Sequence, residues 1–520
     1  MIKSLSNPST LSIYIIAILL VITPFIGIQN IAFIDYPNHL ARYHILENQV
    51  NSKFLQEFYT IKGGFYPYWG MESFMRLFTP ILGVQTTGRI FVIMSLITPV
   101  IGTLLISQTV NKKISTMVLV APVFIFSAIA SWGFVNFLYT LGFAMCAFAL
   151  WIKLENAPWK LRLPLFSIIG LILCSMHMIS VGFLGLFIGF WELYPIVKTR
   201  KITKDDIIKY TLIGLIFIPA GLFILSQSAD DFGGKDTFYG SIYYRIESTQ
   251  SLFNFMGDIN NKSRPISFII GLLIISILMF MRKRDVKGED KETRGKHTYF
   301  TFHPRLIFVG IIFLILSLIV PFAISGVAYI NIRFPLIGIF LIIAALKDIN
   351  LRRPLWLSLI IIGLVATKLS WTHLQLSQGN QEIKALREAS KIIPKGSRIL
   401  PIATGLKPGQ ENTISLPPVH YTHHVAWLTI ERDALFPYFF SMFNVGTHTA
   451  YERQTSPHDF AVDYKNLDTP KIREYAKYWR EDFDYILFMH FGTDITPPQD
   501  TRTVHKDSWF DILEINPVSN

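Results

Sequence analysis

The chain has 520 residues, of which 51% are hydrophobic and only 16% are charged. A soluble protein carries roughly a quarter charged residues, so this composition excludes an ordinary soluble enzyme and indicates a polytopic membrane protein. The formal net charge of +12 gathers in short loops between apolar runs, so no nucleic-acid partner is expected. Cys146 and Cys174 both lie inside apolar runs, and no disulfide is expected between them.

Apolar runs need about 20 residues to cross the hydrocarbon layer of a bilayer. The first run follows Lys3 and has no small-residue cleavage site, so it predicts a retained helix rather than a removed signal peptide. Glu72 and Arg76 interrupt the run at 70–84, which is predicted to be an amphipathic helix at the interface. About eleven spans are predicted, near residues 11–28, 89–110, 114–131, 135–152, 161–179, 181–197, 209–226, 265–281, 306–325, 333–347 and 354–371.

The charges of the loops predict how these spans are oriented. With the N-terminus in the cytoplasm, the inner segments hold most of the loop lysines and arginines, whereas the short outer hairpins SWGF, MIS and GVAYIN hold none. Three longer segments then face outward: 29–88, 227–264 and everything after about residue 372. We therefore expect a multi-pass protein of the bacterial inner membrane whose C-terminal domain is periplasmic or extracellular.

The sequence predicts two domains, a transmembrane domain at 1–371 and an extracytoplasmic α/β domain at 372–520. The second domain shows alternating helical and strand-like segments. We expect helices at 380–393 and 469–482 and strands at 397–404 and 483–491. Such an order is typical of a compact α/β layer.

Asp35 follows the first span by only a few residues, in the stretch FIDYPNHLARYHIL at 33–46. A carboxylate held at the membrane surface can act as a general base toward an acceptor hydroxyl. Equally, Asp followed two residues later by Pro is a good helix N-terminus, so Asp35 can simply cap the helix that follows. Asn38 would cap that helix as well, and both interpretations of Asp35 remain open.

His39, Arg42 and His44 lie on the same predicted helix. The two histidines are five residues apart, whereas a metal pair on a helix prefers three or four, so they are not expected to share a metal. The planar fork of Arg42 suits a phosphate, although the side chain can also anchor the helix among lipid headgroups. An interfacial role without chemistry is the plainer interpretation of both histidines.

The second outer loop begins with acidic and glycine residues and then becomes aromatic. Its aromatic residues suit an interfacial belt or sugar stacking; they are Tyr239, Tyr243, Tyr244 and Phe253. Lys235 and Arg245 are able to reach a lipid phosphate. Asp230, Asp231 and Asp236 match no recognised cation-binding loop, so no cofactor is predicted, and a divalent cation is conceivable but not favoured.

Other ionisable groups stand at the predicted outer ends of spans or in the outer domain. Arg333 begins a span, where a charge calls for a partner such as a lipid phosphate unless it reaches the surface by itself. His177 ends a span, and packing is its plainer interpretation. His420, His423 and His424 allow a metal pair by spacing, but no further ligand lies near them in sequence, so no metal site is predicted.

Together these features resemble the GT-C superfamily of membrane glycosyltransferases. The segment IAFIDYPNHLAR occupies the place of the acidic motif in the first outer loop of that superfamily, and the run 70–84 resembles its juxtamembrane helix. WGFVNFLYTLGF at 132–143 and YINIRFPL at 330–337 resemble a hairpin and a late arginine of uncharacterised bacterial members. The resemblance covers the whole architecture, but its motifs are short.

The resemblance implies inverting transfer of a sugar from a polyprenyl-phosphate donor to a glycan, lipid or protein acceptor on the outer face of the membrane. Asp35 would be the catalytic base, and Arg333 and Arg245 would hold the donor phosphate, with the other substrate-binding candidates being His39, Arg42, His177, Tyr243 and Tyr244. Many members carry a second acidic residue beside the first, whereas here the neighbour is Tyr36. This departure puts a paired-carboxylate or metal mechanism at the motif in doubt.

Other protein classes remain open at this point. A transporter or flippase for lipid-linked sugars predicts charged or broken spans near the bilayer midplane, whereas these spans are nearly free of central charge. A non-enzymatic assembly protein, or a ligase that joins whole lipid-linked glycans, would share the architecture.

Overall fold

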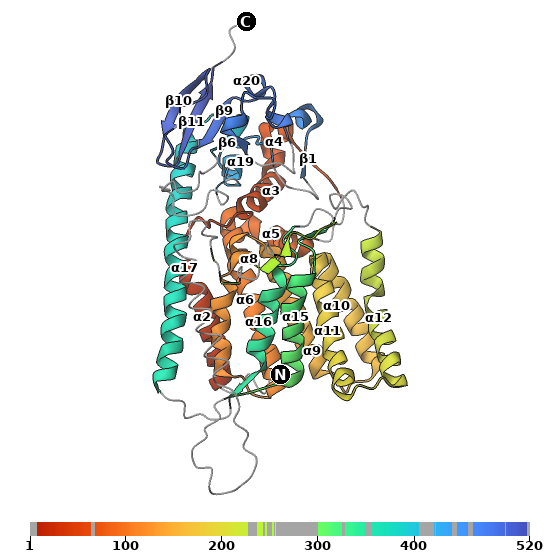
Figure 1. Ribbon diagram of the computed structural model, residues 1–520. Coiled ribbons are helices and arrows are strands. Elements are labelled where there is room, and N and C mark those ends of the chain that lie inside the picture. The colour runs from red at the N-terminus through yellow and green to blue at the C-terminus, as the bar shows by residue number, and fades with distance from the viewer. Residues whose placement is uncertain are drawn as a thin grey trace.

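The computed structural model describes most of the chain. The described residues are 8–63, 68–226, 237–242, 245–246, 252–253, 255, 300–324, 328–348, 355–404, 421, 423–438, 445–455, 461–494 and 496–516. A bundle of apolar helices forms one end of the molecule, and a small α/β domain covers the other end, as Figure 1 shows. The predicted span at 265–281 lies outside the described residues.

Five helices are long and apolar enough to cross a membrane. They are α6 (Val84–Asn111), α9 (Val135–Lys153), α10 (Trp159–Met176), α11 (Met178–Thr199) and α12 (Lys204–Leu225). Three shorter apolar helices, α2 (Pro8–Ile22), α15 (Pro304–Ile319) and α16 (Arg333–Ala345), also belong to the bundle. Each of these eight helices overlaps a span predicted from the sequence.

The predicted span at 114–131 is not one helix. It consists of a 3₁₀ turn at Thr116–Val120, α7 (Ala121–Ile125) and α8 (Ala128–Ser131), and Ser127 between the last two is fully extended. Nearly all of this segment is buried. Irregular backbone is tolerated at membrane depth when protein surrounds it, so a broken segment can pass through the bundle where a lipid-facing one could not.

Close packing in the bundle depends on glycines at helix crossings. A Cβ atom at Gly142 in α9 would lie 2.3 Å from the backbone carbon of Thr98 in α6, and one at Gly338 in α16 would lie 2.9 Å from the backbone oxygen of Gly310 in α15. Small residues allow helices to approach closely in an apolar environment, where packing rather than water exclusion drives association.

Three short helices lie between the bundle and the α/β domain. They are α3 (Tyr36–Asn48), α4 (Lys53–Phe58) and α5 (Trp69–Leu82). The helix α5 matches the amphipathic run at 70–84, with Glu72 buried and Leu77 and Ile81 exposed. The polar residues of α5 distinguish it from the bundle helices, and α5 is not among the helices with the composition of a membrane span.

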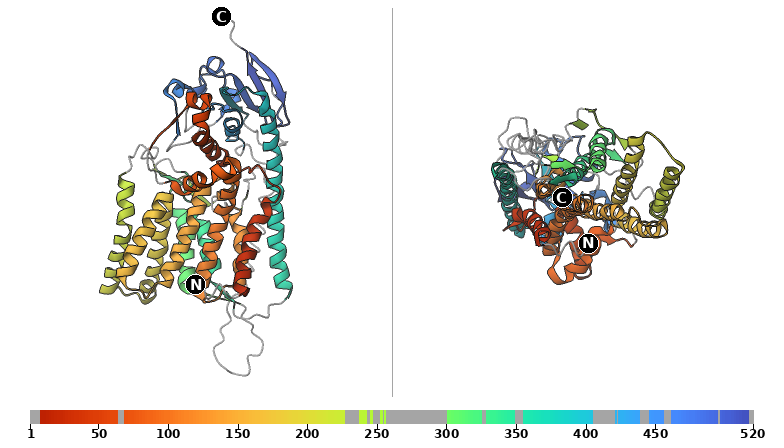
Figure 2. Two further views of the ribbon diagram at one scale, coloured as in Figure 1. Left: turned by 180° about the vertical axis from the view of Figure 1, so that it is seen from behind. Right: turned by 90° about the horizontal axis from the view of Figure 1, so that it is seen from below.

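The helix α17 (Leu355–Ala389) joins the bundle to the α/β domain. Its 35 residues correspond to about 52 Å of helix, and in both side views it runs beside the bundle and continues into the α/β domain (Figures 1 and 2). The predicted domain boundary at 371/372 therefore falls inside one continuous helix, and the separate helix expected at 380–393 is the end of α17 followed by a 3₁₀ turn at Ser390–Ile392.

The α/β domain contains a five-stranded sheet in the order β10-β11-β9-β6-β8. Its strands are β6 (Ile399–Ala403), β8 (Val462–Asp463), β9 (Tyr485–Met489), β10 (Thr501–Lys506) and β11 (Phe510–Ile515). The strands expected at 397–404 and 483–491 are β6 and β9, which pair in parallel. The helix α19 (Ala426–Arg432) packs on the bundle side of the domain, against α3.

The prediction of a helix at 469–482 is wrong over most of that segment. Only α20 (Trp479–Asp482) and a 3₁₀ turn at Glu474–Ala476 are helical there. Asp468 accepts hydrogen bonds from Trp479 Nε1 at 3.3 Å and Arg480 Nη1 at 2.9 Å, and the Tyr475 and Trp479 side chains are buried. These tertiary contacts override the helical preference of the segment.

The segment between α4 and α5 is joined to the α/β domain by a small sheet. β1 (Tyr59–Ile61) pairs antiparallel with β7 (Val445–Thr447), with Tyr59 opposite Thr447. On the other side of this junction, Arg387 of α17 donates to Glu431 of α19 at 2.8 Å and to Gln85 of α6 at 2.9 Å. The bundle and the α/β domain are thus held together at several points.

We predict that Gly142→Ala destabilises the protein, because the added methyl group meets the α6 backbone at the crossing with α9. Overpacking of this kind costs about 1–3 kcal/mol. The expected result is a lower Tm in detergent, measured by the fluorescence of a thiol-independent probe. Gly214→Ala in α12, where nothing lies within 4 Å of the new methyl, is the matched control and should keep its Tm. Equal Tm values for the two variants would contradict the packing argument.

Candidate active site

Asp35 stands at the end of the bundle that faces the α/β domain, here called the Asp35 end. Its backbone is fixed by the turn between α8 and α9: Ile34 N donates to Ser131 O at 2.9 Å, and Asp35 N donates to Trp132 O at 3.0 Å. Gly133 in that turn has φ +87°, and a Cβ there would lie 2.9 Å from Asp35 N. Glycine is therefore required at 133 both by its conformation and by this close approach.

The Asp35 side chain does not cap α3. Asp35 occupies the position before the helix, but its carboxylate makes no hydrogen bond to the helix N-terminus. Asn38 does not cap the helix either, since it lies within the first turn, and its Nδ2 is 2.9 Å from Nδ1 of His423. The capping interpretation left open by the sequence therefore does not describe this carboxylate.

His423, from the α/β domain, lies directly against Asp35. Its Nδ1 is 3.4 Å from Asp35 Oδ1, and its side chain is 9% exposed. Burial lowers the pKa of His423 to about 4, so the imidazole is neutral near pH 7. A neutral imidazole with its proton on Nε2 can accept at Nδ1, from Asn38 or from a protonated Asp35.

Burial also sets the charge state of Asp35 itself. The side chain is 17% exposed, and removal from water raises its pKa to about 8, an effect that Arg333 only partly offsets. A carboxyl group with a pKa near the working pH is poised to give up and take a proton. The physical cause is the usual one, that burial disfavours the charged form.

Arg333 begins α16 and is 4% exposed. Among the residues that the structure describes, the guanidinium donates from Nη2 to the backbone oxygen of Ala328 at 3.4 Å, whereas Nε and Nη1 have no partner. Phe134 and Phe137 of the hairpin region flank the guanidinium, with ring centroids 4.9 and 4.8 Å from its central carbon. No carboxylate in the described part of the chain lies within ion-pair distance of it.

Tyr68, just before α5, lies at the centre of several predicted site residues. Its ring is 5.2 Å from the His177 ring and 6.3 Å from the His39 ring, and the Arg42 guanidinium lies 6.0 Å from its centroid. Burial raises the pKa of its phenol, and the charges of Arg42, Asp35 and Arg333 are all close enough to act on it. Tyr68 is therefore neutral and central.

Arg42 is largely committed to neighbouring protein groups. It donates to Tyr43 Oη at 2.5 Å, and its Nη2 lies 3.7 Å from Oε2 of the buried Glu72. Glu72 in turn accepts from Arg76 at 2.7 Å. This chain ties α3 to α5 on the side of the site away from His423.

The structure thus brings five predicted residues into one region at the Asp35 end: Asp35, His39, Arg42, His177 and Arg333. Burial, together with Arg42 and His423, lowers the pKa of His39 to about 3, so His39 is also neutral. Tyr36, where a second carboxylate would stand in the resemblance, is buried and faces α6, because its hydroxyl lies 3.0 Å from the position of a Cβ on Gly88.

The hydrogen bonds of Arg245 to described residues lie in another part of the bundle. Its Nη1 donates to Leu318 O at 2.9 Å and its Nε to Tyr239 O at 3.0 Å, near the end of α15. Tyr243 and Tyr244 lie outside the described residues, as do the acidic residues of the second loop and His420. Among the described residues, no group of three or more His, Cys, Asp and Glu side chains could hold a metal ion.

Sequence reasoning missed the roles of Tyr68 and His423. Tyr68 is 33 residues from Asp35 and His423 is 388 residues away, so neither belongs to a local motif. The only available signal was the cluster VHYTHHVAW, which spacing alone connected with metal binding rather than with a carboxylate on another domain.

Comparisons with known proteins add little at the level of sequence. No family model matches the chain, and no curated protein matches it. Among solved structures, the chain is similar to the crystal structure of ArnT from Cupriavidus metallidurans in the apo state, with 10% sequence identity, a TM-score of 0.47 and coverage of 98% of both chains. A likeness at this level carries no argument about activity, which has to come from the residues of the site.

The raised pKa of Asp35 predicts how stability depends on pH. Between about pH 4, the ordinary pKa of an aspartate in an unfolded chain, and about pH 8, the folded protein holds a proton that the unfolded chain releases. This stabilisation is fully present below about pH 4 and is lost as the pH rises to about 8. Asp35→Asn should remove the effect, so its free energy of unfolding should fall less than that of the wild type across this range, by at most about 1.4 kcal/mol per pH unit, and its Tm should fall less as well.

Asp433→Asn provides the comparison of opposite sign. Burial would raise the pKa of Asp433, but hydrogen bonds from His44 at 2.8 Å and Ser52 at 2.9 Å outweigh it and lower the pKa. Asp433 therefore stabilises the protein above about pH 4, and its loss should be felt at neutral pH and vanish in acid. Parallel Tm curves for the wild type and Asp35→Asn between pH 4 and 8 would contradict the account of Asp35.

Proposed function

We propose that this protein is an inverting glycosyltransferase of the bacterial inner membrane. It would transfer a sugar from a polyprenyl-phosphate donor to a hydroxyl of a glycan, lipid or protein acceptor on the outer face. The observation that supports this most strongly is Arg333, a buried arginine with two unpartnered guanidinium nitrogens among the described residues, close to a carboxyl group that titrates near neutral pH.

A phosphate is the ligand that best matches the charge and the hydrogen-bonding geometry of the Arg333 guanidinium. A buried guanidinium without a counterion is costly, and its planar fork suits two phosphate oxygens at once. Phe134 and Phe137 flank the group with apolar rings, which would strengthen its interaction with an anion by excluding water. A donor carried on a polyprenyl chain would deliver its phosphate to this depth because the apolar chain stays in the bilayer.

Asp35 would act as the base in this reaction. As the acceptor oxygen forms a bond to the anomeric carbon, its proton passes to the Asp35 carboxylate. The bond between that carbon and the phosphate oxygen breaks on the opposite side of the sugar, and its electron pair leaves with the polyprenyl phosphate. Arg333 would offset the charge that develops on this leaving group. A carboxyl pKa of about 8 is close to the optimum for such proton transfer.

The α/β domain would complete the site through His423. Its neutral imidazole contacts both Asp35 and Asn38, and would restrict the position of the Asp35 side chain. Tyr68, His39 and His177 form an aromatic and imidazole surface between Arg42 and Arg333, which is a suitable wall for the apolar face of a sugar ring. A transporter would need such groups along a path through the bundle, whereas here they gather at one end.

Asp35→Asn tests the base. The isosteric amide cannot accept the proton, so sugar transfer should fall by about 100-fold or more, with the folded protein and its membrane insertion unchanged. Transfer of labelled sugar from a panel of polyprenyl-phosphate sugars to membrane acceptors would be followed in nanodiscs. Asp205→Asn, an exposed aspartate at the opposite end of the bundle, is the matched control and should keep full activity. Full activity in a folded Asp35→Asn variant would remove Asp35 from the reaction.

Arg333→Met tests the phosphate site without needing the right sugar or acceptor. The variant keeps much of the apolar volume but loses the cation, so binding of a polyprenyl phosphate should weaken by about 10- to 100-fold. Binding would be measured by tryptophan fluorescence or native mass spectrometry. Arg76→Met, whose side chain is 58% exposed, serves as the control. Unchanged affinity in a folded Arg333→Met variant would mean that the donor phosphate binds elsewhere.

A further inference from the structure

A pocket lies at the other end of the helix bundle, here called the Lys153 end. Its volume is about 710 Å³. The helix α9 starts beside Asp35 at Val135 and ends at Lys153 in the pocket wall, a distance of about 28 Å along the helix. The pocket is therefore separate from the site around Asp35, and its function does not depend on the one proposed there.

The wall of this pocket is built from a rigid network around Arg305. The Arg305 guanidinium donates to Glu155 at 2.5 Å, to Glu192 at 3.0 Å and to the backbone oxygen of Trp191 at 2.6 Å. It also lies 4.1 Å from the centroid of the Trp191 ring, which stacks on His303 at 5.5 Å with an interplanar angle of 10°. Since Arg305 is fully engaged, it shapes the pocket rather than offering a free charge.

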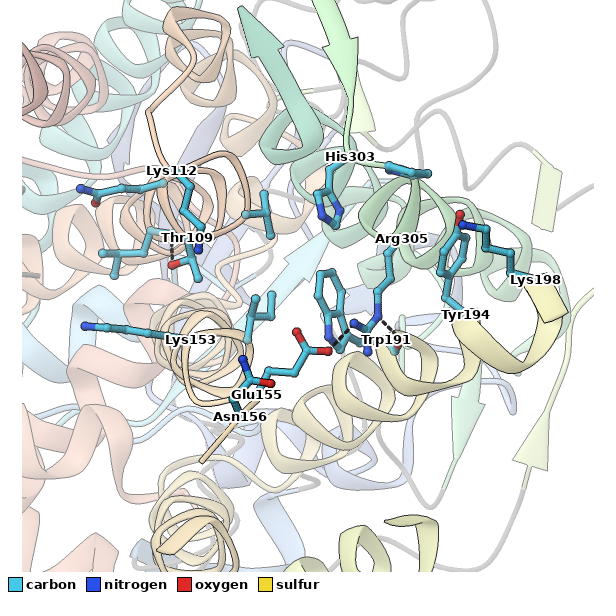
Figure 3. A pocket seen from close by; sticks show the side chains of 15 residues that line it. Thr109, Lys112, Lys153, Glu155, Asn156, Trp191, Tyr194, Lys198, His303 and Arg305 are labelled. Atoms are coloured by element: carbon cyan, nitrogen blue, oxygen red, sulfur yellow. Dashed lines mark hydrogen bonds and ion pairs between the residues drawn. The ribbon is translucent and has the colours of Figure 1, made fainter. Parts of the chain in front are cut away.

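Three lysines supply the free charge. Lys112, Lys153 and Lys198 come from the ends of α6, α9 and α11, and all three are exposed. None of them forms an ion pair with a residue that the structure describes, whereas Glu155, the one acidic residue in the lining, is bound to Arg305. Figure 3 shows Lys112 and Lys198 on opposite sides of the hollow, with Trp191 and Arg305 between them. The pocket is therefore cationic.

The lining also offers apolar surface and unused polar atoms. Leu105, Val110 and Ile152 line the pocket beside the lysines. Within the described part of the chain, Nε1 of Trp191 and Nδ1 of His303 are buried without a hydrogen-bond partner, and Trp191 is only 2% exposed. A ligand with an anionic head and an apolar part would match the lysines and this apolar surface.

We propose that this pocket binds the phosphate headgroup of an anionic membrane lipid. Basic pockets between the ends of membrane helices are suited to such headgroups, because lysines attract the phosphate while apolar side chains receive the start of the acyl chains. The volume is in the range that holds a small-molecule ligand and exceeds what a bare phosphate ion would fill. A soluble phosphate would also leave the apolar part of the lining unused.

The test uses the full-length protein and measures lipid binding by native mass spectrometry. Phosphatidylglycerol is the anionic probe, phosphatidylcholine is the zwitterionic comparison, and inorganic phosphate is the soluble comparison. Lys112→Gln combined with Lys198→Gln should weaken phosphatidylglycerol binding by about 30-fold, as expected for two lysines near a charged headgroup. The wild type should bind phosphatidylglycerol more tightly than phosphatidylcholine.

Lys160→Gln combined with Lys201→Gln is the matched control, because it removes the same charge from exposed lysines at the same end that do not line the pocket. Its affinity for phosphatidylglycerol should equal that of the wild type, and the Tm values of all three proteins without lipid should agree. Equal lipid affinity in both double variants would overturn the proposal. Inorganic phosphate that binds as tightly as phosphatidylglycerol would also overturn it, by assigning the pocket to a soluble anion.

Discussion

Asp35 and Arg333 are both largely withdrawn from water at one end of the helix bundle, yet no ion pair within 4 Å joins them. Leaving a buried carboxyl group and a buried guanidinium unpaired costs several kcal/mol that the rest of the fold has to offset. The protein meets part of this cost by protonation, since burial raises the pKa of Asp35 to about 8. Among the described residues, no ion pair reduces the cost of burying the Arg333 charge, and an incoming anion would reduce it.

Other features of the fold keep these two groups in place. Gly133 allows the backbone of residue 35 to lie against the turn before α9, and the same region supplies the aromatic rings around Arg333. From the opposite direction, the α/β domain supplies His423. The β1–β7 pairing and the contacts of Asp433 with His44 and Ser52 hold that domain on the segment that contains α3, α4 and β1. The complete site therefore exists only when the two parts of the chain are docked.

Much of this architecture could be predicted from the sequence, because apolar runs and loop charges are local properties. Hydropathy located eight of the helices, and β-branched and apolar runs located β6 and β9. Asp35 and Arg333 were recognisable because a charge beside an apolar run is unusual. The break in the segment 114–131 could not be recognised from the sequence, because it is burial inside the bundle that permits the break. For the same reason, helical preference at 469–482 gave way to the contacts of Asp468.

The site itself was only partly accessible to such reasoning. Tyr68 and His423 reach Asp35 through tertiary packing, and no spacing rule connects residues that far apart. Arg245 was a reasonable phosphate candidate by charge and by predicted side, but its guanidinium bonds to backbone oxygens near α15. Charge in a loop indicates what a residue can bind, whereas its partners in the folded chain decide whether it is available.

The most direct measurement is an electron cryomicroscopy structure of the protein with a bound polyprenyl-phosphate sugar. The account predicts phosphate density in contact with Arg333 Nε and Nη1, and the anomeric carbon of the sugar on the side that faces Asp35. Phosphate density at a different place, with the Arg333 nitrogens still without a partner, would contradict it.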